Sequence, residues 1–149
     1  MKPTRIKGTL LILLGILGLG AIFGGGSLII SPSGKLLGMP LTMLEHSPFN
    51  DFLIPGIILF FVLGVAPVAL VFALLAKPKS KLAELLNIYG DMHWSWTCSI
   101  FTAFALIIWI QLEMVFLQAV HWSHTLYMFL ALSILFVALL PQVRNLYKK

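Results

Sequence analysis

The residues of this sequence best suited to chemistry are a carboxylate and two histidines in its second half. Glu113 falls inside an apolar stretch, and His121 and His124 follow shortly after that stretch. A carboxylate in hydrocarbon is costly and marks a functional site by default, and imidazoles exchange protons or bind metal ions. Asp51, from an earlier loop, joins them in a candidate ligand or proton site, in which His121 and His124 are candidate metal ligands.

A structural interpretation of the same residues competes with the chemical one. If a helix begins at Trp94, Glu113 lies about 28 Å along it at about 1.5 Å per residue, near the membrane boundary where burying a carboxylate costs less. Glu113 would then accept hydrogen bonds from a neighbouring helix or loop, and the two histidines would be turn residues. Because two histidines at this spacing are a weak metal signal, we prefer this second interpretation.

Other signatures of enzyme chemistry are missing from the sequence. It has neither a Ser-His-Asp signature nor a glycine-rich phosphate loop, and Cys98 is its only cysteine, so dithiol chemistry within one chain is excluded. No acidic residue precedes Glu45, which separates the chain from small multidrug exporters that use a carboxylate in their first helix. The sequence therefore predicts no catalytic residue and no cofactor.

The elements that would hold these residues are membrane-spanning helices. Of the 149 residues, 60% are hydrophobic and 10% are charged, whereas soluble chains are about one quarter charged. A helix of about 20 mostly apolar residues crosses the hydrocarbon core and satisfies its own backbone hydrogen bonds there. We therefore predict an all-α, polytopic membrane protein with one domain, residues 1–149, and four transmembrane helices. The predicted helices run from about Gly8 to Ile30, Phe52 to Ala76, Trp94 to Val120 and Thr125 to Val143.

The basic residues predict how these helices are oriented. Lys and Arg residues precede the first predicted helix and follow the second and the fourth, whereas Lys35 alone falls in a loop on the other side. Because cytoplasmic loops carry an excess of Lys and Arg, we predict that both termini are cytoplasmic (N-in/C-in) and that the chain lies in the inner (plasma) membrane of its cell. The net charge of +5 is then a topology signal that also attracts anionic lipids, and it implies no nucleic-acid partner.

Two connections are predicted to carry structure of their own. The external loop, residues 31–51, interleaves prolines with leucine and methionine, so we expect a short apolar helix near Pro40 that covers the outer ends of the bundle. Between the second and third helices, Leu82, Leu85 and Tyr89 recur at helical spacing among lysines. This spacing predicts a short amphipathic helix along the cytoplasmic interface.

Glycine and proline positions indicate how the helices meet. Gly20 and Gly24 have the small-xxx-small spacing that lets helix backbones approach closely, so we predict a packing contact there, within the chain or with a second copy. Pro67 falls in the middle of the second helix and removes a backbone hydrogen bond, which predicts a kink or hinge. Such a kink serves packing more often than motion.

The first loop and the start of the second helix also carry a pattern of short segments. They read Ser-Pro-Ser-Gly at 31–34, Leu-Gly-Met-Pro-Leu at 37–41 and Ser-Pro-Phe-Asn-Asp-Phe-Leu-Ile-Pro-Gly at 47–56. This pattern resembles small bacterial four-helix membrane proteins of unassigned function. The resemblance implies the four-helix architecture and a structured external loop, and it implies no activity and no catalytic residue.

Three functions are open at this point. The sequence favours a noncatalytic inner-membrane protein, an accessory component that contacts the lipid bilayer and a membrane protein partner or a second copy of itself. One alternative is a small transporter or proton-coupled carrier that uses Glu113, Asp51 and the Pro67 kink, although the predicted helices offer few polar residues to line a path. The other is an outer-face metal-binding protein or enzyme that uses Glu113, His121 and His124.

Overall fold

Four apolar stretches of the chain form long helices in the computed structural model, which describes residues 3–149. Each of the four has the length and hydropathy needed to cross a membrane, and the described residues contain no β-strand. The predicted all-helical class is therefore confirmed. The elements are α1 (Pro3–Ile30), the 3-10 turns η1 (Lys35–Leu37) and η2 (Leu41–Leu44), α2 (Leu53–Ile58), the π-helical segment η3 (Leu59–Val65), α3 (Ala66–Ala76), α4 (Lys81–Leu85), α5 (Trp94–Leu117), α6 (Trp122–Leu139) and α7 (Pro141–Leu146).

The helix ends differ from the predicted ones where the local backbone interrupts the helix. α5 ends before its predicted limit because Gln118 adopts a left-handed backbone with φ 49°. α6 begins earlier than predicted and ends at Leu139, because Leu140 is extended ahead of Pro141 and a residue before proline disfavours the helical region. The last residues of the predicted fourth helix therefore belong to a separate short helix, α7.

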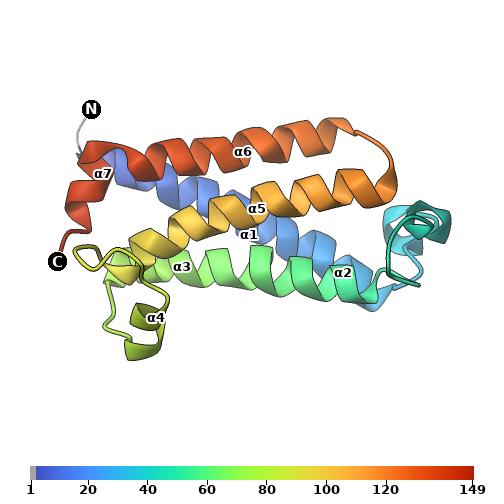
Figure 1. Cartoon of the computed structure of the whole chain (residues 1–149), viewed down its shortest axis with the longest axis horizontal. Helices are drawn as coiled ribbons and strands as arrows, with labels where there is room; N and C mark the ends of the chain where they lie inside the picture. The colour runs from blue at the N-terminus through green and yellow to red at the C-terminus, as the bar shows by residue number, and fades with distance from the viewer. Residues whose placement is uncertain (1–2) are drawn as a thin grey trace.

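Figure 1 shows that the two ends of the bundle are built from different parts of the chain. The start of α1, the end of α3, α4 and α7 lie at one end, which we call the terminal end. The α1–α2 connection and the α5–α6 turn lie at the opposite end, which we call the loop end. α6 lies beside α1 at the terminal end, and the two helices separate toward the loop end. This separation determines where space is left inside the bundle.

The tightest contact between helices joins α1 to the second spanning helix. A Cβ atom added to Gly25 would lie 2.6 Å from the backbone nitrogen of Phe60, and one added to Gly64 would lie 3.0 Å from the backbone nitrogen of Ile22. Because these neighbours are backbone atoms, only glycine allows such an approach. The glycines at this contact are Gly18 and Gly25 on α1, Gly56 on α2 and Gly64 in η3.

Gly20 and Gly24, where the sequence had placed the close contact, lie beside it on α1. A Cβ atom on Gly24 would meet only Leu59, at an ordinary distance of 3.5 Å, and one on Gly20 would lie 2.9 Å from the hydroxyl of Tyr127. Both glycines line the cavity described below. Because Gly20 and Gly24 carry no side chains, they leave room inside the bundle. The close contact between helix backbones is formed on α1 by Gly18 and Gly25.

The second spanning helix changes its hydrogen-bonding pattern just before Pro67. At the end of η3 the N–H of Ala66 bonds to the carbonyl of Phe61, five residues earlier, in place of the usual four. Pro67 has no N–H, so the regular pattern would be interrupted here in any case. The segments α2, η3 and α3 follow one another along one path (Figure 1), and Pro67 lies in the first turn of α3, just after the π-helical segment. Hinge motion at Pro67 stays a prediction.

The terminal end of the bundle is closed by buried hydrogen bonds between segments distant in sequence. The indole N–H of Trp96 donates to the carbonyl of Ala138 at 2.8 Å, and the hydroxyl of Tyr147 donates to the carbonyl of Leu74 at 3.0 Å. The ammonium group of Lys77 lies 5.0 Å from the centre of the Tyr147 ring. Because polar groups buried in a low dielectric are costly unless paired, these contacts hold the C-terminal segment against the bundle.

The segment between α3 and α5 is attached to the bundle by Asn87. Its amide group donates to the carbonyl of Met92 at 2.7 Å and to the carboxylate of Glu84 at 2.9 Å, and it accepts a hydrogen bond from the hydroxyl of Thr97. The amphipathic helix predicted here is limited to α4, whose start is capped by Ser80. The exposed aliphatic side chains of the segment are Leu82, Leu85, Leu86 and Ile88.

Candidate functional site

The connection between α1 and α2 folds back over the loop end of the bundle. Gly34 adopts a left-handed backbone with φ 75°, and its carbonyl accepts the N–H of Met39 at 2.9 Å. The N–H of Phe52 bonds to the carbonyl of Pro32, which joins the two ends of the loop. Phe52 and Leu44 are buried together in a small apolar cluster of their own. The loop is therefore a folded cover on the bundle.

A cavity of about 410 Å³ lies beneath this loop, between α1, α5 and α6. Sites for small molecules have volumes of about 300–1,000 Å³. Most of the cavity wall is apolar, and the glycines of α1 widen it because they carry no side chains. The apolar wall includes Leu17, Leu28, Met39, Met43, Leu59 and Leu106.

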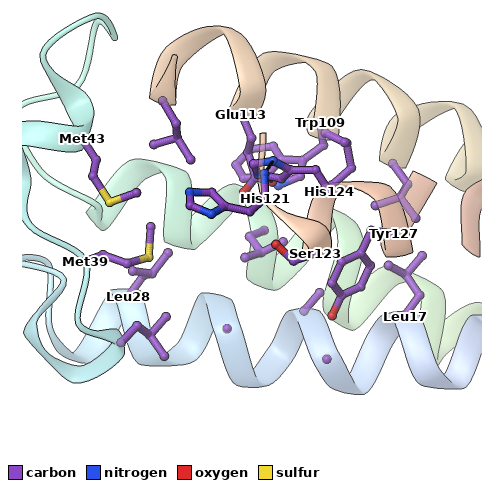
Figure 2. Close-up of a pocket in the computed structure, with 18 of the residues that line it drawn as sticks. Leu17, Leu28, Met39, Met43, Trp109, Glu113, His121, Ser123, His124 and Tyr127 are labelled. Carbon is purple, nitrogen blue, oxygen red and sulfur yellow. Dashed lines mark hydrogen bonds and ion pairs between the residues drawn. The ribbon is translucent and has the colours of Figure 1, made fainter. Parts of the chain in front are cut away.

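One wall of the cavity carries Glu113 together with His124. Oε2 of Glu113 lies 3.8 Å from Nε2 of His124, and Trp109 lines the same cavity. The Glu113 side chain is 32% exposed, whereas that of His124 is 6% exposed. Figure 2 shows the three side chains gathered on one side of the cavity, across from α1. The structure thus brings together two of the residues that the sequence had singled out.

His124 makes a different contact with each of its ring nitrogens. Nδ1 accepts a hydrogen bond from the backbone N–H of His121 at 3.1 Å, at the start of α6. A ring nitrogen that accepts an N–H carries no proton, so the proton of His124 is on Nε2, the nitrogen that faces Glu113. The His124 ring is therefore a neutral imidazole, whose Nε2–H lies 3.8 Å from the carboxylate of Glu113 and brings it no positive charge.

Asp51 and His121 stand apart from this polar wall. Asp51 accepts the backbone N–H of Leu53 at 2.9 Å, which caps the start of α2, and it does not line the cavity. His121 is exposed at the cavity edge, with its ring centre 5.7 Å from that of His124. Across residues 3–149 no group of three or more His, Cys, Asp or Glu side chains is arranged to hold a metal ion. The predicted metal ligands His121 and His124 line one cavity, and metal binding by them stays a prediction.

Two aromatic residues of the site were missed in the sequence. Trp109 lies one helical turn before Glu113 on α5, and Tyr127 lies one turn after His124 on α6. In Figure 2 the Tyr127 ring extends from α6 with its hydroxyl directed toward α1, where Gly20 leaves room for it. Because residues one turn apart share a helix face, this spacing was the signal that could have identified both.

The cavity ends inside the bundle. Leu17, Leu106 and Tyr127 line its inner part. Toward the terminal end the helices are packed through side chains with 0% exposure, such as Leu14 on α1 and Ile134 on α6. No polar side chain of residues 3–149 that lines the cavity lies beyond Tyr127 in this direction. The cavity is therefore one-sided, with its polar wall near the loop end.

A smaller cavity of about 120 Å³ adjoins the first beneath the loop. Phe49 and Phe116 line it, and their rings meet edge to face with their centres 6.1 Å apart. Glu113 and Trp109 line both cavities. The carboxylate therefore lies on the wall between two apolar spaces, both of which are covered by the loop.

Comparisons with protein-family models, with curated proteins and with solved structures give no match to this chain. The resemblance carried by residues 31–56 accordingly stays a prediction.

Proposed function

We propose that this chain is a noncatalytic multi-pass protein of a bacterial inner (plasma) membrane, an accessory component that holds an apolar or amphipathic molecule at its loop end. The observation that carries the proposal is the one-sided cavity of about 410 Å³ with Glu113 and His124 on its wall. A mostly apolar cavity with a few convergent polar groups is the usual form of a site that binds a small molecule. The loop residues Met39 and Met43 would cover the bound molecule.

Both termini are proposed to face the cytoplasm, which places the cavity on the outer side of the membrane. From Arg5 onward, every Lys and Arg except Lys35 belongs to a segment at the terminal end of the bundle. An excess of these residues is typical of the cytoplasmic side. Trp94 and Trp122 begin α5 and α6 at opposite ends, which suits the two aromatic belts of a membrane protein.

In this orientation the segment that contains α4 lies along the cytoplasmic interface. Leu82 and Leu85 are exposed to the surroundings of the bundle, and Lys79 and Lys81 are exposed beside them. Apolar side chains next to lysines are suited to the boundary between lipid headgroups and acyl chains. The segment would therefore anchor the terminal end in the inner leaflet.

Binding has more support than transport as the role of the cavity. A carrier needs a polar path that reaches the second side of the membrane. Beyond Tyr127 the helices are packed through fully buried apolar residues such as Leu14, Ala103 and Ile134. A metal-dependent role also has little support, because Nδ1 of His124 is already occupied by a backbone N–H.

Cysteine labelling in intact cells tests the orientation. In a Cys98→Ser background, Glu45→Cys and Lys79→Cys each place one thiol at an exposed position, the first at the loop end and the second at the terminal end. We expect a membrane-impermeant maleimide to label Glu45→Cys in intact cells and Lys79→Cys only after the membrane is opened. The reverse pattern would contradict the proposed orientation.

Dye binding tests the role of the cavity. The purified chain in lipid nanodiscs is titrated with Nile red, a neutral dye whose fluorescence rises in apolar surroundings. Gly24→Leu places a branched side chain in the cavity, whereas Gly15→Leu makes the same exchange at a glycine that does not line it. We expect Gly24→Leu to reduce saturable dye binding at least tenfold and Gly15→Leu to leave it unchanged. Equal binding by both variants would contradict a cavity that holds ligands.

A further inference from the structure

We propose that the molecule held in this cavity carries a positive charge. It would be an amphipathic amine or ammonium compound, with its charged head at Glu113 and its apolar part in the space beside α1. The inference rests on the proposed binding function and adds the chemical class of the ligand.

The charge balance of the cavity wall is incomplete. Within residues 3–149 no Lys or Arg lines the cavity or forms an ion pair with Glu113. The cavity is also lined by two side chains that could carry a positive charge: His121, which is exposed at the cavity edge, and His124, which is neutral because its Nδ1 accepts an N–H. A carboxylate in apolar surroundings without a cation is unfavourable. A cationic ligand would supply the missing charge.

The aromatic residues of the wall suit the same kind of head group. Ammonium groups are attracted to the faces of Trp and Tyr rings, and Trp109 and Tyr127 border the space next to Glu113. An anionic head group would instead lie close to the carboxylate in a low dielectric, where like charges repel strongly. Fatty acids and acidic lipid head groups are therefore poor candidates for this cavity.

The remainder of the cavity suits an apolar chain or ring. Leu17, Ala21 and Leu106 form the inner wall, and Gly20 and Gly24 leave room beside it. On the loop side the wall is formed by methionines, whose unbranched thioether side chains adapt to ligands of different shape. The site thus has a fixed polar wall and an adaptable apolar cover, so we expect it to select for charge more strongly than for shape.

Three compounds with twelve carbon atoms in an unbranched chain test the inference. Dodecylamine is cationic at neutral pH, because the pKa of an alkyl amine is about 10. Dodecanol is neutral, and dodecanoate is anionic. Native mass spectrometry of the full chain in a bulky sterol-based detergent counts the molecules bound. We expect one dodecylamine per chain, bound at least tenfold more tightly than dodecanol, and no binding of dodecanoate.

A pair of matched variants assigns this preference to one carboxylate. Glu113→Gln should weaken dodecylamine binding at least tenfold and leave dodecanol binding unchanged. Glu45→Gln removes an exposed carboxylate from the loop, outside the cavity, and should bind dodecylamine as the unaltered chain does. If Glu113→Gln does not fold, as judged by size-exclusion chromatography, the ratio of dodecylamine to dodecanol binding in the unaltered chain decides whether the cavity prefers a cation.

The outcomes separate this inference from the function on which it rests. Equal binding of dodecanol and dodecylamine, unaffected by Glu113→Gln, would overturn the charge preference while the binding function stood. Tighter binding of dodecanoate would overturn the charge preference as well. Absence of binding by all three compounds, together with no saturable binding of Nile red, would overturn both.

Discussion

The hydroxyl of Tyr147 donates a hydrogen bond of 3.0 Å to the backbone carbonyl of Leu74, and so joins the C-terminal segment to the second spanning helix. Both residues have 0% exposure. Burial raises the pKa of Tyr147 to about 12, because the phenolate form is disfavoured away from water. A neutral phenol therefore holds the terminal end of the bundle together.

Replacing this phenol gives the first prediction. Tyr147→Phe leaves the carbonyl of Leu74 without its partner and should lower the free energy of unfolding by about 1 kcal/mol at neutral pH. Because the pKa of Tyr147 is raised from 10.0 to about 12 by folding, its contribution is complete below pH 10 and is lost as the pH rises toward 12. Thermal unfolding in detergent at neutral and alkaline pH should therefore show the two proteins converging. Equal stability at neutral pH would contradict the prediction.

The glycine contact gives the second prediction. A Cβ atom on Gly25 would lie 2.6 Å from the backbone nitrogen of Phe60, so Gly25→Ala should lower the free energy of unfolding by about 1–3 kcal/mol. Gly15 has nothing within 4 Å of its added Cβ, so Gly15→Ala should be neutral or stabilise by up to about 1 kcal/mol through helix propensity. Unfolding of both variants by titration with sodium dodecyl sulfate provides the measurement. A loss of equal size in both would show that the contact is not the cause.

The C-terminal ion pair gives the third prediction. Glu84 has a lowered pKa, first because of its hydrogen bond with Lys149 at 2.7 Å and then because of that with Asn87. Lys149→Ala should raise the pKa of Glu84 toward its ordinary value, whereas Lys148→Ala should leave it unchanged. Because the pKa is lowered by folding, the contribution of this pair is present above the ordinary pKa and is lost as the pH falls.

The measurement for the ion pair is a carboxyl titration followed by nuclear magnetic resonance with labelled glutamate. Glu84 is at the surface, so we expect the shift to shrink as salt is added and the effect on stability to be small. An identical titration of Glu84 in Lys149→Ala and in the unaltered chain would show that the lysine does not hold the carboxylate.

The start of α6 gives the fourth prediction. His124→Ala removes the acceptor for the backbone N–H of His121 and should lower the free energy of unfolding by about 1 kcal/mol. The amide of His121 should also exchange its hydrogen faster, which hydrogen-exchange mass spectrometry measures. Thr125→Ala, at the exposed neighbouring position, is the control and should leave the exchange unchanged. Unaltered exchange in His124→Ala would show that another group holds this N–H.

The four spanning helices could be predicted because length and hydropathy are properties of each segment by itself. The residues that join the helices could not be predicted, because they depend on how each helix is rotated about its axis. Gly20 and Gly24 have the spacing of a close contact, but the close contact within the chain is made by Gly18 and Gly25, on another face of α1. The end of α6 before Pro141 was missed because the apolar run continues past it.

Only part of the candidate site could be predicted, because residue type and position along a segment can be read from the sequence whereas the packing of helices cannot. Glu113 and His124 were singled out because both are polar residues near one end of the apolar stretches, and the structure places them 3.8 Å apart. Asp51 was included for its charge, but its carboxylate is used to cap α2. Trp109 and Tyr127 were passed over because aromatic residues are ordinary in spanning helices, and only the cavity shows that they line the same space as Glu113.

The π-helical segment has a consequence for the length of the second spanning helix. Gly18 and Gly25 are seven residues apart, about two turns of α1, whereas Gly56 and Gly64 are eight apart. In a regular α-helix, eight residues would turn Gly64 about 80° away from Gly56. The π-helical segment η3 absorbs the extra residue, so that Gly56 and Gly64 both face α1. If one residue between them were deleted, a regular α-helix would give the two glycines the same alignment. If one residue were added, a regular α-helix would not. Insertions and deletions in this helix should therefore be tolerated unequally over evolution, with shortening permitted and lengthening selected against.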